Sequence, residues 1–193
     1  MRRLLFLVVA AVVAGVPIAE AGGNVKRLGT DPSGDAPPAI DIAYLDVGTT
    51  QVDIAGQRTP TLEIRLGLNG MLPVFGSYPE VPAMEWIFKA GKRSFIAEAV
   101  AGRNPRFFLF ELKGDSYEQL PSPTGRFDTA GGFAQILVPL EALGAKRGTV
   151  LTGIKKPLEL LGNSGADVDI HIHHATGTEY VDEMTTTKSF TIP

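Results

Sequence analysis

The chain of 193 residues contains no cysteine. Disulfide bonds, zinc–thiolate sites, redox pairs, thiol nucleophiles and a lipid-modified N-terminal cysteine are therefore excluded. Basic residues are also few, with 18 Lys and Arg against 21 Asp and Glu, and they form no run. This balance argues against nucleic acid or an anionic membrane surface as a partner. Stability must then come from a hydrophobic core, to which a bound metal ion can add.

Long apolar runs are lacking apart from one at the N-terminus. That run covers residues 4–16, follows two arginines and precedes the small-x-small cleavage site Ala19-Glu20-Ala21. It is shorter than the ~20 residues that a membrane-spanning helix needs. We therefore expect residues 1–21 to be a cleaved signal peptide, the alternative being a retained anchor. The mature chain is expected to be secreted, extracellular or periplasmic, with no membrane span.

Helical periodicity is missing too, and short alternating segments separated by Gly and Pro take its place. Residues 22–39 are expected to be a loop-rich segment leading into one domain, residues 40–193. The alternation predicts an all-β antiparallel β-sandwich of jelly-roll type with about nine to ten strands. These strands are expected at residues 42–47, 62–68, 84–89, 94–100, 106–112, 117–120, 133–138, 150–154, 168–174 and 188–192.

Three further segments are expected to connect these strands. Residues 52–60 read as an irregular connection, and residues 70–82 as a long exposed loop because they are rich in Gly and Pro. Residues 139–144 read as one short helical turn that ends at a glycine. In the strand 62–68, the leucines and Ile64 are expected to face the core, with Glu63 and Arg65 on the opposite face.

An acidic segment precedes the first expected strand of the domain. Asp31, Ser33 and Asp35 stand at positions i, i+2 and i+4, as do the first oxygen ligands of many calcium loops. Asp41 and backbone carbonyls would have to complete the shell, because calcium takes six to eight oxygens. The segment departs from a helix-loop-helix calcium loop, with Ala36 at the position of the invariant glycine and no Glu at the closing position. The alternative is a cluster of ordinary Asx turns.

All three histidines lie at positions 171, 173 and 174, in an expected strand. A period of two puts Asp169, His171 and His173 on one face, to which Asp167 can be added. Two imidazoles and a carboxylate can hold Zn²⁺ or Cu²⁺. The alternative is a solvated polar face of a half-buried strand.

Aromatic side chains offer a third kind of candidate site. Saccharides bind to exposed aromatic faces, and the candidates are Phe75 and Tyr78 in the Gly/Pro-rich loop, and Trp86. For Trp86 the alternative is a core position, because it lies on an alternating strand.

The motif Asp31-Pro32-Ser33-Gly34-Asp35, followed by Asp41-Ile42, resembles the opening of family 9 carbohydrate-binding modules and DOMON domains. Trp86 and Phe88, and the later Ile136-Leu137-Val138-Pro139 and Leu143-Gly144, are similar to their downstream strands. The resemblance implies a secreted β-sandwich with structural calcium and a saccharide ligand. Members of this fold also bind haem or serve as accessory domains.

Catalytic motifs are absent: the sequence has no nucleophile elbow, no phosphate-binding glycine loop and no H-E-x-x-H segment. We therefore expect no enzyme. The prediction is an exported, non-catalytic binding module, with carbohydrate as ligand and calcium as a structural ion. The alternatives are a transition-metal-binding protein that uses the histidine strand and a protein-interaction accessory domain.

Overall fold

The computed structural model describes residues 25–32, 34–36, 41–54, 56–70, 82–114, 116–154, 166–174 and 177–193. For residues 172–174 and 177–181 it describes the backbone alone. The expected signal peptide and the candidate ligands Ser33, Phe75 and Tyr78 lie outside the described residues. Within these ranges the chain forms thirteen β-strands and no helix, and hence no helix that could span a membrane.

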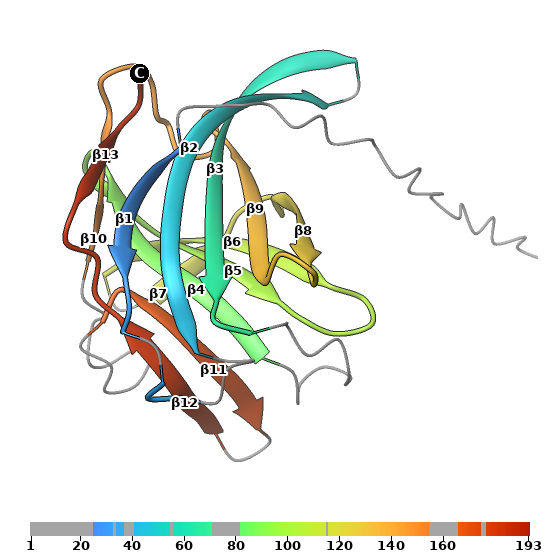
Figure 1. Ribbon diagram of the computed structural model, residues 1–193. Helices are drawn as coiled ribbons and strands as arrows, with labels where there is room; N and C mark the ends of the chain where they lie inside the picture. The colour runs from blue at the N-terminus through green and yellow to red at the C-terminus, as the bar shows by residue number, and fades with distance from the viewer. Residues whose placement is uncertain are drawn as a thin grey trace, which may run out of the picture.

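Two antiparallel sheets pack against each other (Figure 1). The five-stranded sheet has the order β1 (Lys26–Thr30), β2 (Ile42–Ile54), β3 (Gln57–Leu68), β9 (Phe133–Pro139) and β8 (Thr124–Asp128). The eight-stranded sheet has the order β12 (Gly177–Met184), β11 (Val168–His174), β4 (Pro82–Ala90), β5 (Arg93–Val100), β6 (Arg106–Lys113) and β7 (Ser116–Gln119). Its last two strands are β10 (Val150–Gly153), which pairs with β4, and β13 (Ser189–Thr191), which pairs with β10.

The core lies between the sheets and follows the predicted alternation. In β3, Leu62, Ile64, Leu66 and Leu68 all belong to it, which confirms the predicted inward face. Glu63 lies on the opposite face but is only 2% exposed, and Arg65 and Gln135 both donate hydrogen bonds to its buried carboxylate. The predicted all-β antiparallel sandwich is confirmed, and its jelly-roll type stays a prediction.

The expected count of nine to ten strands is too low, and three strands account for the difference. The segment 22–39, expected to be loop, contains β1, whose Leu28 is fully buried. Strands β8 and β12 also lie where no strand was predicted. All three are edge strands, with a neighbouring strand on one side only.

The irregular connection predicted over residues 52–60 is wrong. β2 and β3 instead continue as a two-stranded ribbon that turns tightly at Gly56, whose φ is 82°. β9 pairs with β3 only as far as Thr61, so the end of the ribbon projects beyond the sheet (Figure 1). Its side chains are mostly exposed on both faces, which removes the alternation that marks a strand.

The short segment after β9 also differs from the expectation. Residues 140–144 form successive turns and no helix. The glycine at its end, Gly144, does have a positive φ of 61°, and its N–H donates to the carbonyl of Glu141. In contrast, the hairpin predicted between residues 84 and 100 is confirmed as β4 and β5.

Candidate functional site

Three of the four predicted calcium ligands come together in space. Asp31, Asp35 and Asp41 each place a carboxylate oxygen within 4.8 Å of the others, and Asp182 joins them as a fourth member. We call these four residues the acidic site. Ser33, the remaining predicted ligand, lies outside the described residues.

Backbone hydrogen bonds hold the acidic site at the start of β2. The backbone N–H of Asp31, just after β1, donates to the carbonyl of Ala43 over 3.1 Å. The side chain of Asp41 folds back on the same segment, where its Oδ2 accepts a 2.9 Å hydrogen bond from the backbone of Gly34. Gly34 has a φ of 104°, in the left-handed region that glycine tolerates.

Asp182 reaches the acidic site from β12, in the other sheet. Its Oδ2 accepts a hydrogen bond from the backbone N–H of Ile42, and its Oδ1 accepts one from Glu183 over 2.9 Å. The two sheets thus meet here, at the lower end of β2 beside β12 in Figure 1. No sequence signal connected Asp182 with residues about 140 positions earlier, since the pairing exists only after the sheets pack.

Burial and neighbouring negative charges raise the pKa of two of these carboxylates, Asp31 and Asp182. Asp41 is 1% exposed and Asp182 is 7% exposed. Burial, together with the charges of Asp182, Asp35 and Asp41, raises the pKa of Asp31 to about 6. Burial also raises the pKa of Asp182, although its two backbone hydrogen bonds oppose the change.

Two oxygens of the acidic site are buried without a hydrogen-bond partner among the described residues. They are Asp41 Oδ1 and Asp31 Oδ2. Buried carboxylate oxygens are normally paired, because leaving them unpaired costs free energy. Asx turns satisfy such oxygens with nearby backbone N–H groups, and here the Gly34 bond satisfies the other oxygen of Asp41. The two remaining oxygens therefore suit a cation.

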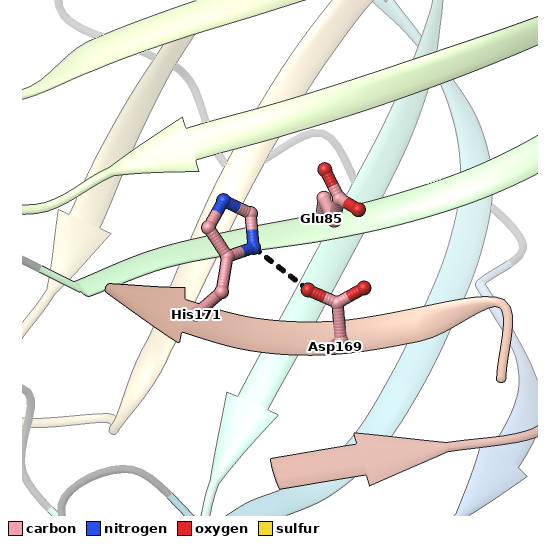
Figure 2. Close-up of side chains that lie close together, drawn as sticks. All are labelled: Glu85, Asp169 and His171. Atoms are coloured by element: carbon pink, nitrogen blue, oxygen red, sulfur yellow. Dashed lines mark hydrogen bonds and ion pairs between the residues drawn. The ribbon is translucent and has the colours of Figure 1, made fainter. Parts of the chain in front are cut away.

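A second group forms around the predicted histidine strand. Glu85, Asp169 and His171 place ligand atoms within 4.8 Å of one another (Figure 2). His171 Nδ1 lies 2.7 Å from Asp169 Oδ1, and His171 Nε2 lies 3.8 Å from an oxygen of Glu98. We call Glu85, Glu98, Asp169 and His171 the histidine cluster.

The histidine cluster is buried, so the alternative of a solvated polar face is wrong for Asp169 and His171. Their exposed fractions are 0% and 3%, and those of Glu85 and Glu98 are 4% and 8%. The predicted shared face of Asp169 and His171 is confirmed. The side chain of His173 lies outside the described residues. Asp167 bonds elsewhere, to Trp86 and Thr186.

Strand register assembles this cluster. Asp169 on β11 lies directly opposite Glu85 on β4, and Glu85 lies opposite Glu98 on β5. Burial disfavours the charged imidazole of His171, but the Asp169 hydrogen bond and the charges of Glu85, Asp169 and Glu98 outweigh it and raise its pKa. In the sequence, Glu85 is a charged residue within the apolar segment around Trp86. It gave no sign that β4 would pair with β11.

Trp86 lies in the core, which was the alternative to a saccharide-binding role. It is fully buried and stacks on Phe88 with ring centroids 4.2 Å apart. Its indole Nε1 donates to Asp167 Oδ2 over 3.4 Å. Trp86 therefore offers no exposed face to a saccharide.

Comparisons of this chain with protein-family models, with curated proteins and with solved structures found no match. The resemblance to family 9 carbohydrate-binding modules and DOMON domains therefore stays a prediction.

Proposed function

We propose that this protein is an exported, non-catalytic β-sandwich module whose acidic site binds a structural calcium ion. The observation that carries the proposal is the side chain of Asp41. It is almost fully buried, its Oδ1 has no hydrogen-bond partner among the described residues, and three other carboxylates lie within reach. An anionic, oxygen-only environment of this kind favours a hard divalent cation.

The number of donors agrees with calcium. Four carboxylates supply four oxygens when each binds through one atom, and more when some bind through two. Calcium accepts six to eight oxygens in a flexible arrangement, whereas Mg²⁺ requires a near-ideal octahedron and retains several waters. The mixture of buried and exposed carboxylates in the acidic site leaves room for water ligands on the Asp35 side.

A calcium ion at this position would act on the fold itself. Asp31, Asp35 and Asp41 belong to the segment that joins β1 to β2, in the five-stranded sheet, and Asp182 belongs to the eight-stranded sheet. An ion shared between them would link the two sheets and fix the segment that leads into β2. It would also offset the negative charges of the neighbouring carboxylates, which add to burial in raising the pKa of Asp31.

The test is calcium binding by the full chain and by two variants. Isothermal titration calorimetry of chelator-treated protein should show one calcium per chain. Asp182→Asn should weaken that binding by at least tenfold, because it removes one negative ligand. Glu141→Gln, a change at an exposed carboxylate outside the acidic site, should leave it unchanged. Absence of calcium binding to the unaltered chain at millimolar concentration would refute the proposal.

Saccharide binding remains the predicted role of the module. Its support is the resemblance and the aromatic residues Phe75 and Tyr78 of the Gly/Pro-rich loop. A glycan array probed in the presence of calcium and again with chelator tests it. Binding that Phe75→Ala and Tyr78→Ala both abolish would support this role, and a blank array would favour the protein-interaction alternative.

A further inference from the structure

The histidine cluster lies on the outer face of the eight-stranded sheet. On β4, Met84, Trp86 and Phe88 face the core, so Glu85 faces outward. The same alternation on β11, where Val168 and Ile170 face the core, turns Asp169 and His171 outward. The four side chains of the cluster are nevertheless buried, and their chemistry differs from that of the acidic site because they include an imidazole.

We propose that Glu85, Asp169 and His171, with Glu98 beside them, form a second metal site that takes a divalent transition metal, Zn²⁺ foremost. Imidazole nitrogen and carboxylate oxygen are both ordinary Zn²⁺ ligands. Calcium prefers oxygen alone, so one nitrogen among the donors shifts the preference toward zinc. The site predicted from the sequence combined Asp169 and His171 with His173. The proposed site combines them with Glu85 of β4 and Glu98 of β5.

The geometry around His171 supports a metal ligand. Its Nδ1 lies 2.7 Å from Asp169 Oδ1, and Glu85 offers a further ligand atom within 4.8 Å, on the same side of the ring (Figure 2). Two ligands that share a tetrahedral Zn²⁺ at ordinary bond lengths lie about 3.3–3.5 Å apart, so small movements of these side chains would admit one ion. The other ring nitrogen, Nε2, lies 3.8 Å from an oxygen of Glu98. A carboxylate beside the second nitrogen typically orients a histidine that binds metal.

The register of the sheet provides the second argument. Asp169, Glu85 and Glu98 form a row of carboxylates directly opposite one another across β11, β4 and β5. This register gathers carboxylate donors from three strands at one place on the sheet, beside the imidazole of His171. The three strands are neighbours within the larger sheet, so they hold the donors in place before the ion binds.

The experiment measures Zn²⁺ on the full chain with calcium present at saturation, so that the acidic site does not compete. Elemental analysis after gel filtration, with calorimetry for affinity, should show one zinc per chain. His171→Gln, which keeps the size and polarity of the side chain, should weaken binding by at least a hundredfold, and Glu98→Gln by about tenfold or more. The His173→Ala/His174→Ala double variant is the matched control and should retain zinc.

Cobalt gives an independent measurement on the unaltered chain. Four-coordinate Co²⁺ bound by one nitrogen and several oxygens absorbs strongly in the visible range. Adding Zn²⁺ should displace the Co²⁺ and abolish this absorption. This readout remains informative if His171→Gln fails to fold. Asp182→Asn should lose calcium while keeping zinc, so the two metal proposals fail separately. No zinc on the unaltered chain, or zinc lost equally in the double-histidine control, would overturn this proposal.

Discussion

Replacing Asp41 by asparagine should act in opposite directions with and without calcium. The asparagine Oδ1 can keep the hydrogen bond from the Gly34 backbone, which Asp41 accepts through Oδ2. Its amide then takes the place of the buried oxygen that lacks a partner and can donate to a neighbouring carboxylate. In chelator the variant should be more stable than the unaltered chain, because one of four crowded charges is gone. With calcium present, the variant should gain less stability from the ion than the unaltered chain does.

The size of the effect follows from the spacing of the acidic site. Two unit charges 4.8 Å apart repel by about 3.5 kcal/mol at an effective dielectric constant of 20. Solvent around Asp35 and partial protonation of Asp31 reduce the relief, so we expect a gain of about 1–2 kcal/mol in chelator. Calcium at about 100 times its dissociation constant would stabilise the unaltered chain by about 2.7 kcal/mol. For a domain of this size that is a rise of about 5–11 °C in melting temperature.

Thermal and urea denaturation, each with chelator and with calcium, measure both effects. Calcium should raise the melting temperature of the Asp41→Asn variant by less than about 2 °C. Glu141→Gln, the exposed control, should respond to calcium as the unaltered chain does. An Asp41→Asn variant that is less stable in chelator, yet gains as much from calcium, would show that Asp41 is an ordinary structural carboxylate.

Three further changes test the fold and its electrostatics. The pKa of Asp31 is raised to about 6 from 3.8, so the folded, calcium-free protein binds more protons than the unfolded chain between these pH values. Its free energy of unfolding should therefore fall by about 1–2 kcal/mol as the pH rises from 4 to 6. Urea denaturation across this range should show a smaller loss for Asp31→Asn, and an identical loss would contradict the assignment. Trp86→Ala should cost about 3–5 kcal/mol in the same assay, because the side chain is fully buried and stacked. Gly67→Ala should cost about 1–3 kcal/mol, because its Cβ would lie 2.1 Å from the ring of Tyr44; a thermal melt unchanged by this substitution would show that the ring moves aside freely.

The strands that the sequence predicted well are those buried on at least one face with clear alternation. The strand containing Leu62 and Ile64 and the hairpin around Trp86 fall in this class. β1, β8 and the projecting ends of β2 and β3 were missed or misread as loop, because their faces are covered unevenly or not at all. The alternation of apolar and polar residues reflects which face of a strand is buried. It therefore cannot identify a strand that buries little of either face.

In the candidate sites, the residues that are close in sequence were predicted, and those that come from distant strands were not. Asp31, Asp35 and Asp41 are close in sequence, and turn chemistry predicted that they lie together. Asp169 and His171 are also close in sequence, and strand alternation predicted that they share a face. Asp182, Glu85 and Glu98 were not predicted, because each comes from a different strand.

The sequence by itself determined the class of fold, the inward face of the central strands and the two places where chemistry-bearing residues gather. Only the tertiary structure decided which residues complete each group and that Asp41, Asp169 and His171 are buried. The physical reason is that local patterns record whether a residue faces inward or outward on its own strand. They carry no record of the strand that pairs beside it or of the sheet that packs against it. Here sheet packing supplies Asp182 to the acidic site, and strand pairing supplies two of the four residues in the histidine cluster.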